Sequence, residues 1–201
     1  MTQPSKDEIF ELLRLHEEWA NTLDKADRLG KPLAMDRLSM SGLDLSDRNL
    51  HGIILFASQF DRCNLQRTHL CYSHLGDVSF VGADFAGGCL VKAQVSDSNW
   101  AGCTLRGANL LRTVFFRVDM RRVDFSGADM SQTLLSEADL REANFSGANL
   151  EWISLSNQDL RGATGFETVR AEKILIQVDG KTTVLEGLDN IREWLFKASR
   201  L

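Results

Sequence analysis

Every fifth residue from Met35 to Leu160 is apolar, and this period limits the possible folds more than any other feature of the chain. All 26 positions of the series hold Leu, Met, Phe, Val or Trp, although only 43% of the 201 residues are apolar. Chance would produce such a series in roughly one register in a few billion. An α-helix would spread the stripe around its axis, and a flat strand would turn it from face to face. The chain must therefore turn after each unit of five residues.

The position two residues before each apolar centre holds mostly small side chains. Nineteen of these 26 residues are Ala, Gly, Ser, Thr, Cys or Val, and Asp or Asn often stands between the small residue and the centre. A small and a large side chain can point inward together and fill a narrow interior, while Asp, Asn, Ser and Gly favour turns. The exceptions lie near the two ends of the series: Leu33, Leu38, Leu43, Arg48, Ile53, Ile153 and Gln158.

Five segments carry the pattern in its clearest form, and they resemble the A(D/N)LxX motif of the pentapeptide-repeat family. The segments are 82–85, 107–110, 127–130, 137–140 and 147–150. The resemblance implies an all-β solenoid, a right-handed quadrilateral β-helix with four pentapeptides in each coil. The segment from Phe60 to Val95 departs most from the motif. Its residues at the Asp/Asn position include His69, His74, Ser79, Cys89 and Gln94.

Both ends of a solenoid expose an apolar interior and unpaired backbone, so both need caps. We expect one structural domain with an N-terminal capping α-helix in residues 1–34, the β-helix in 35–164 and a C-terminal cap in 165–201. Ser5 and Glu8 match a capping box at the start of the N-terminal helix. Helical spacing of apolar residues and a stop signal follow, in Ile9, Leu12, Leu13, Trp19, Leu23, Ala26, Gly30 and Pro32.

The C-terminal cap is predicted to be a β-hairpin followed by a short α-helix. Asp179-Gly180 between two apolar runs indicates a two-residue hairpin turn. From about Asp189 an apolar stripe with helical spacing follows, in Ile191, Trp194, Leu195 and Ala198. This helix could cap the last coil, or it could form a homodimer, because family members that protect topoisomerases pair through C-terminal elements.

No catalytic, cofactor or metal site is predicted. The chain lacks the G-x-S-x-G, phosphate-loop and H-E-x-x-H motifs. It has no apolar run of about 18 residues and no signal-peptide pattern at its N-terminus. The four cysteines have no C-x-x-C spacing, which favours reduced thiols and a cytoplasmic location. His51, His69, Cys71 and Cys89 form a rectangle on the third face of the coil, but a flat rectangle suits zinc poorly.

A set of outward apolar residues is the strongest candidate for a protein-binding site. With twenty residues per coil, Ile54, Phe56, Val114, Phe116 and Leu134 point outward from the fourth face, and Val91 and Leu111 lie around the adjacent corner. Contiguous exposed apolar surface marks partner sites. Alternatively, the C-terminal hairpin or helix could fold back and cover it. On the first face, Asp119, Asp139 and Asp159 stack beside Arg121, Arg141 and Arg161, which indicates mutual support or an arginine site for an anionic partner.

These features favour a non-enzymatic scaffold that binds a protein partner of unknown identity. The family resemblance raises a first alternative, a DNA mimic that binds a type II topoisomerase (DNA gyrase) and protects it from inhibitors. A second alternative is a secreted bacterial effector. Residues 35–164 contain 15 acidic and 12 basic residues, whereas duplex DNA carries one charge per ~1.7 Å of its axis. The weak charge argues against mimicry, and the lack of a basic stripe argues against direct nucleic-acid binding.

Overall fold

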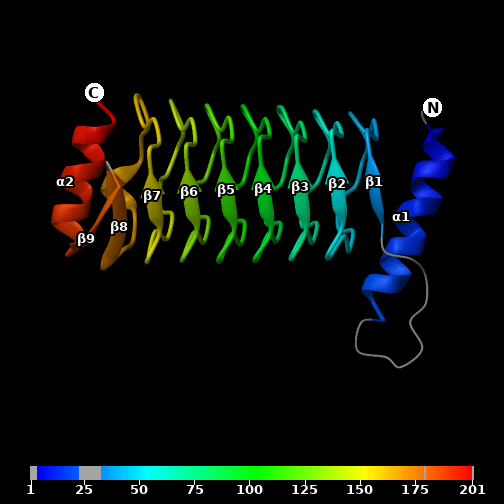
Figure 1. Cartoon of the computed structure of the whole chain (residues 1–201), viewed down its shortest axis with the longest axis horizontal. Helices are drawn as coiled ribbons and strands as arrows, with labels where there is room; N and C mark the ends of the chain where they lie inside the picture. Colours follow the sequence, from blue (N-terminus) through cyan, green and yellow to red (C-terminus); the bar gives the residue numbers. More distant parts are fainter. Residues whose placement is uncertain (1–3, 23–32, 179, 201) are drawn as a thin grey trace.

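A computed structural model describes residues 4–22, 33–178 and 180–200 of the chain. It shows a four-sided β-helix with a helix at each end, as predicted (Figure 1). One face carries a nine-stranded sheet in the order β1 to β9. Its strands are β1 (Ala34–Asp36), β2 (Ile54–Phe56), β3 (His74–Gly76), β4 (Gln94–Ser96), β5 (Val114–Phe116), β6 (Leu134–Ser136), β7 (Ser154–Ser156), β8 (Lys173–Val178) and β9 (Lys181–Glu186).

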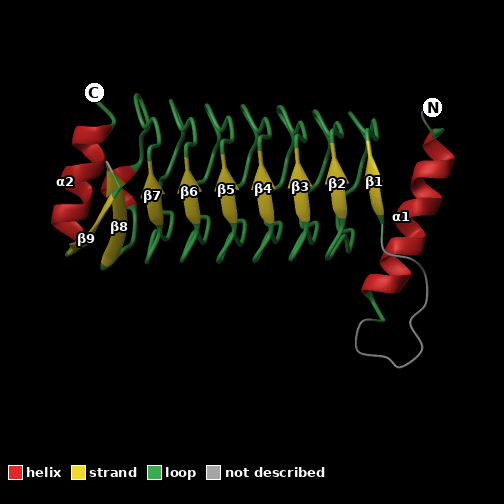
Figure 2. Ribbon diagram, in the orientation of Figure 1, coloured by secondary structure: helices red, strands yellow, loops and turns green. Residues whose placement is uncertain are grey.

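The register confirms a coil of twenty residues. Strands β1 to β7 pair in parallel with a constant offset, for example Leu55 with Leu75. The other three faces, which Figure 2 draws as loops, repeat the offset. They do so as single bridges, such as Asn64 with Asp84. Backbone N–H groups therefore bond to the neighbouring coil along the whole rod, which satisfies polar groups that the interior cannot. We number the faces by their central columns: face 1 holds Met40, face 2 Leu45, face 3 Leu50 and face 4 Leu55, and face 4 carries the strands.

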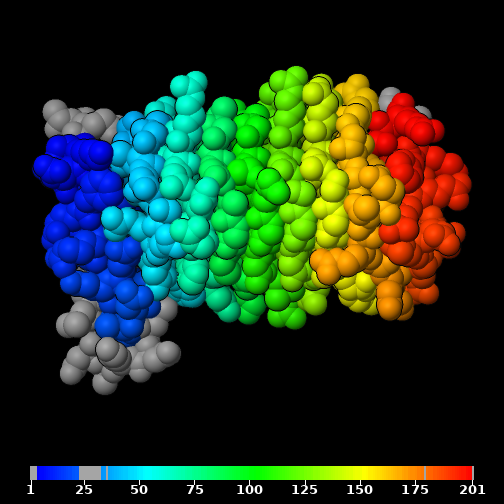
Figure 3. All heavy atoms as spheres, turned by 180° about the vertical axis from the view of Figure 1, so that it is seen from behind, coloured from blue at the N-terminus to red at the C-terminus, as the bar shows by residue number. Residues whose placement is uncertain are grey.

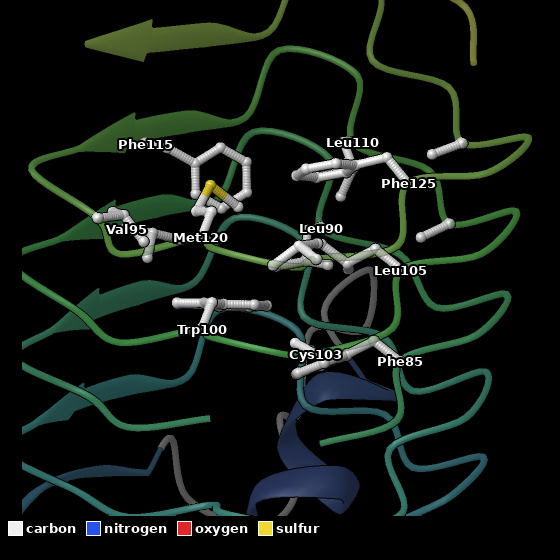
Figure 4. Packing of buried hydrophobic residues seen from close by; sticks show 14 of the residues in the cluster. Phe85, Leu90, Val95, Trp100, Cys103, Leu105, Leu110, Phe115, Met120 and Phe125 are labelled. Carbon is white, nitrogen blue, oxygen red and sulfur yellow. The ribbon is translucent and has the colours of Figure 1, made fainter. Parts of the chain in front are cut away.

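The interior is filled by the period-five residues together with the small residues two positions earlier. The large aromatic residues stack along faces 1 and 2, for example Phe60 on Phe80 with ring centroids 4.9 Å apart. Trp100 is fully buried and lies 4.3 Å from Phe80 and 5.1 Å from Phe85. Figure 4 shows Trp100 and Phe85 among the side chains that point into the interior of the coil. The predicted inward columns are confirmed.

Asp and Asn side chains fix the turns on the first three faces. The Oδ1 atom of Asn109 accepts a hydrogen bond from the Leu111 N–H at 3.1 Å, and Asp129 accepts one from the Ser131 N–H at 3.1 Å. The residue that follows at the corner has a positive φ, as in Arg112 (58°). The Asp/Asn residue before each centre thus holds the chain in its turn.

Helix α1 (Lys6–Ala20) covers the N-terminal coil, and the predicted capping box of Ser5 and Glu8 is present. Its buried residues are Ile9, Leu13, His16 and Ala20. The Nδ1 atom of His16 accepts a hydrogen bond from the Leu33 N–H at 2.8 Å, and burial lowers the pKa of His16. Arg48, an exception to the small-residue rule, faces this helix and bonds Glu17 at 2.8 Å. The predicted helical positions Leu23 and Ala26 and the stop at Gly30 and Pro32 lie outside the described residues.

The C-terminal end is closed by η1 (Phe166–Thr168), the hairpin of β8 and β9, and helix α2 (Leu188–Ala198). The hairpin is confirmed: β8 and β9 pair antiparallel, and Val178 lies opposite Lys181. Gly180 has a φ of 73°, whereas Asp179 lies outside the described residues. Helix α2 buries Ile191 and Leu195 against this end. Figure 3 shows α1 and α2 covering opposite ends of the rod.

The expectation of four reduced cysteines is wrong. Cys71 and Cys89 form a disulfide between neighbouring coils, with their Cα atoms 5.8 Å apart. The sequence placed both on the outer side of face 3, but the absence of C-x-x-C spacing led us to expect free thiols. A bond between successive coils needs no such spacing, because residues 18 positions apart become neighbours once the coil has turned.

Candidate protein-interaction surface

The outer side of face 4 presents apolar side chains because residues alternate along each strand. In β2 the central Leu55 is buried, while Ile54 and Phe56 on either side of it are 39% and 49% exposed. The same alternation in β5 buries Phe115 and leaves Val114 and Phe116 half-buried on the outer surface. Phe115 and Phe116 therefore point to opposite sides of the wall.

The ring of Phe56 lies over Gly76 of the next coil. A Cβ atom added to Gly76 would lie 2.3 Å from Cε1 of Phe56, so this space is available only because residue 76 has no side chain. Gly76 is consequently buried although it lies on the outer side of its strand. One edge of the Phe56 ring thus rests on the backbone of the next coil, and about half of the side chain stays open to a partner.

Phe116 is less accessible than Phe56. The guanidinium carbon of Arg117 lies 4.2 Å from the centroid of the Phe116 ring, a distance typical of a cation–π contact. Arg117 is held in place by Asp97 on the preceding coil, with Nε to Oδ1 at 2.6 Å and Nη2 to Oδ2 at 3.0 Å. The charged pair covers part of the ring, and Leu134 on the next coil is also half-buried.

The predicted apolar surface is therefore two groups instead of one strip. Between Phe56 and Phe116 the same column carries Gly76 and Ser96, and between Ile54 and Val114 it carries His74 and Gln94. These polar or small residues interrupt the apolar surface for two coils, or roughly 10 Å at sheet spacing. The proposal that the C-terminal hairpin or helix folds back over this face is wrong, because β8 and β9 extend the sheet beyond β7.

Val91 and Leu111 follow Cys71 in one column on face 3. Both are half-buried. The Lys92 N–H bonds the Leu111 carbonyl at 3.0 Å, which fixes their coils side by side. They lie around the corner from face 4, as predicted, but they continue the column of the disulfide and do not join the exposed group at Phe56.

Tyr72 belongs to the exposed apolar surface, although the sequence analysis did not select it. The residue stands at the corner between faces 3 and 4 and is 48% exposed. Its ring centroid lies 5.1 Å from that of His51, and Lys92 donates a hydrogen bond to its hydroxyl at 3.1 Å. Its sequence position indicates an exposed aromatic residue, because the other corners of the coil mostly carry Gly or charged residues. We call Ile54, Phe56 and Tyr72 the N-terminal apolar patch.

Acidic groups flank this patch. Asp36 pairs with Phe56 in the register of β1 and β2, and Asp77 follows Gly76 at the next corner. Both carboxylates are exposed, and neither forms an ion pair with another residue in the described part of the chain. Two cations also border the patch: Lys92 contacts Tyr72 on one side, and on the other side the exposed Arg37 follows Asp36 and donates its N–H to the Phe56 carbonyl at 2.8 Å. A ligand that reaches Phe56 therefore meets two carboxylates that have no ion-pair partner in the described part of the chain.

The Asp and Arg columns on face 1 form a charge-balanced ladder. Arg141 bonds Asp139 of its own coil through Nε at 2.9 Å and Nη2 at 2.6 Å, and its Nε lies 3.6 Å from Asp159 of the next coil. Arg121 repeats this arrangement with Asp119, and Arg161 pairs with Asp159. Hydrogen bonds from these arginines lower the pKa of Asp119 and of Asp159. Because each guanidinium already has a carboxylate partner, the ladder supports the coils.

The residues predicted to form a dimer contact lie in helix α2. Ile191 and Leu195 are 0% and 1% exposed and pack against the end of the rod. Trp194 and Ala198 are half-buried. Two of the four residues in the predicted dimer stripe of α2 thus already cover the last coil. The apolar surface that α2 could offer to a second copy of the chain is therefore smaller than the sequence predicts.

Two classes of site receive no support from the described residues. Within residues 4–22, 33–178 and 180–200, no three His, Cys, Asp or Glu residues are placed to hold a metal ion. The rectangle of two histidines and two cysteines on face 3 contains the disulfide instead. The same residues include no helix that is long and apolar enough to cross a bilayer.

A coil of four pentapeptides, repeated from β1 to β7 and capped at both ends, defines a β-solenoid of the pentapeptide type. The sequence model of the family described as Pentapeptide repeats matches residues 58–97, 96–132 and 119–157, with eight copies of the repeat. The chain belongs to this pentapeptide-repeat family.

Comparison with solved structures finds similar proteins, of which QnrB1 shares the fold. QnrB1, described as a plasmid-mediated fluoroquinolone resistance protein, is 19% identical with a TM-score of 0.58, over 68% of this chain and 78% of that one. HetL, described as involved in heterocyst differentiation regulation in the cyanobacterium Nostoc sp. strain PCC 7120, is 17% identical over 91% of this chain and all of its own. Its TM-score is only 0.29. No curated protein sequence is significantly similar to the chain.

Proposed function

We propose that the protein is a non-catalytic scaffold that binds a protein partner through the N-terminal apolar patch. The observation that carries the proposal is the exposure of Ile54, Phe56 and Tyr72 on adjacent coils. Large exposed apolar residues gathered in one place favour association, and aromatic residues are enriched at the energetic centres of interfaces. The coils hold these side chains on a rigid wall, which reduces the entropy that binding would otherwise cost.

The charges around the patch define the chemistry of the partner. Asp36 and Asp77 flank Phe56 without ion pairs in the described part of the chain. A complementary segment would place apolar side chains on Phe56 and Ile54 and one or more Lys or Arg residues toward these carboxylates. Complementary charge at the rim favours the correct partner and accelerates encounter.

Affinity capture with two matched variants tests the proposal. Phe56→Asp removes the exposed ring, whereas Phe116→Asp makes the same chemical change at the half-covered position of the same column. We expect the partner to be lost with Phe56→Asp and retained with Phe116→Asp, and its affinity to fall by about 30-fold or more, as at an interface hot spot. Equal retention by both variants would refute the patch as the binding site.

Gyrase protection by DNA mimicry is a weaker candidate. The likeness to QnrB1 shows a common fold at 19% identity. A mimic needs dense unpaired negative charge, but the carboxylates of face 1 are paired with Arg121, Arg141 and Arg161. We expect the purified protein to leave gyrase supercoiling and its inhibition by quinolones unchanged at all concentrations.

We also infer that the protein is monomeric at moderate concentration. Ile191 and Leu195, the centre of the predicted dimer stripe, are already buried against the last coil. Light scattering should give the mass of one chain, 22.5 kDa. A mass near twice this value, lost on substitution of Trp194, would instead support pairing through α2.

A further inference from the structure

The two disulfide cysteines lie on the outer surface of face 3, at the boundary between two coils. Cys71 follows the buried Leu70, and Cys89 precedes the buried Leu90 of the next coil, where it bridges to His69. Their Cα atoms are 5.8 Å apart, within the usual range for a disulfide. Both residues are half-buried and not fully enclosed. Small thiols and disulfides in solution can therefore reach them.

The other two cysteines differ in every respect that controls thiol reactivity. Cys63 and Cys103 are each 1% exposed in the interior. Burial raises the pKa of the Cys63 thiol to about 11 and also raises the pKa of Cys103. Because the thiolate is the reactive form, these two residues are inert in the folded protein, and the pair on face 3 contains the reactive cysteines.

The disulfide stands where the repeat lacks its usual turn bonds. Elsewhere on face 3 the Asp/Asn side chain accepts a hydrogen bond from the N–H two residues later, as in Asn109 with Leu111 and Asp129 with Ser131. His69 and Cys89 occupy that position in the two coils joined by the disulfide. Within the described residues, the N–H groups of Cys71 and Val91 donate no hydrogen bond to a side chain at this position. A covalent link therefore joins the two coils whose turns on face 3 lack this hydrogen bond.

We propose that Cys71 and Cys89 are a redox modification site that closes and opens by exchange with small-molecule disulfides and thiols of the glutathione class. In the closing reaction, one cysteine thiolate attacks a sulfur of oxidised glutathione and releases one glutathione thiolate, which takes up a proton. The second cysteine thiolate then attacks the mixed disulfide and releases the second glutathione. Two protein thiols are oxidised to one disulfide, and one glutathione disulfide is reduced to two thiols.

The state of this site controls how strongly the two coils hold together. The link joins residues 18 positions apart, and closing a loop of this size in the unfolded chain raises Tm by roughly 5–10 °C in a protein of this length. Opening the bond leaves the coils joined by backbone hydrogen bonds alone at the turns that lack Asp or Asn. The proposal is independent of any protein partner.

Thiol counting in the full chain tests the site. We expect no thiols to react in the oxidised native protein and two in the native protein after treatment with excess reduced glutathione. Return to oxidised glutathione should remove these two thiols and lower the mass by two hydrogens. A bond that resists reduced glutathione in the native state would overturn the proposal. So would two stable glutathione adducts without ring closure, or a bond that involves Cys63 or Cys103.

Two variants separate the site from a general effect on folding. Cys71→Ser should abolish ring closure, so that Cys89 takes up no more than one glutathione, and should abolish the Tm difference between disulfide-closed and reduced samples. Cys103→Ala is the matched control, because its inward column also holds Ala83 and Ala143 and accepts that side chain. The control should exchange normally. Loss of exchange in the control, or an unchanged redox-dependent Tm shift in Cys71→Ser, would refute the assignment.

Discussion

Residues 60–96, which we call the irregular segment, and residues 105–160, the regular segment, have the same interior but different exteriors. Phe80 and Phe125 are 1% and 0% exposed, and their columns run through both segments without a break. On the outside of faces 1 to 3, the regular segment has Asp or Asn at nearly every turn, whereas the irregular segment has His69, Ser79 and Cys89. The inward columns alone thus suffice to form the coil, and the Asp/Asn positions are free to vary where the surface is specialised.

Substitutions in the interior give the largest effect and test whether the two interiors are equivalent. Phe80→Ala and Phe125→Ala should each lower the free energy of unfolding by about 3–5 kcal/mol, because each leaves a cavity in a closely packed column. The ring centroids of Phe80 and Phe60 are 4.9 Å apart, and those of Phe125 and Phe145 are 5.2 Å apart. Denaturant unfolding measures both. A cost below about 1 kcal/mol at Phe80 alone would show that the irregular segment is loosely packed.

Substitutions that remove or add a hydrogen bond at a turn should give the next largest change in the free energy of unfolding. The change should have opposite signs in the two segments. Asn109→Ala removes the bond to the Leu111 N–H and should cost about 1 kcal/mol. His69→Asn supplies the missing bond to the Cys71 N–H and should add about 0.5 kcal/mol. Both values are compared in the oxidised protein, so that the disulfide is constant. Destabilisation by His69→Asn would show that His69 has a role which the Asp/Asn residue cannot replace.

Acid should weaken the regular segment first. Arginine hydrogen bonds hold the pKa of Asp119 and of Asp159 below the usual value, which is about 3.9 in an unfolded chain. Their contribution to stability is complete above that value and is lost as the pH falls from there through the lowered pKa. Hydrogen exchange near pH 3 should therefore show greater opening at Asp159 than at Asp61. Arg141→Gln should reduce this difference, and Arg62→Gln serves as the control.

The smallest effect on stability is expected at Gly76. In Gly76→Ala the new methyl group meets Cε1 of Phe56, and the ring can swing outward, so the cost should be below about 1 kcal/mol. The NMR contact between the Phe56 ring and residue 76 should disappear, and affinity for the partner should fall with it. Ser96→Ala, one coil further along the same column, is the control. A retained contact would mean that the backbone of β3 had shifted instead.

The sequence predicts the solenoid almost completely because its period is a direct consequence of the coil. Even an exception was informative, since Arg48 breaks the small-residue rule at the coil that faces α1 and Glu17. Exposure on the outer surface was harder to predict. Phe56 and Phe116 have equivalent positions in the repeat, but Gly76 supports one ring and Arg117 covers the other. The exposed fraction of each ring therefore depends on residues of the neighbouring coil and corner and not on the position of the ring in the repeat.

The twenty-residue coil also determines how the length of such a chain can change. Deletion or duplication of one pentapeptide would preserve the inward stripe, yet it would rotate every later residue by a quarter turn around the axis. If this occurred between Cys71 and Cys89, the two cysteines would emerge on different sides of the rod. The Asp–Arg ladder would likewise move to another side relative to the N-terminal apolar patch. Only the gain or loss of a whole coil conserves these relationships, so a chain of this kind grows in steps of twenty residues.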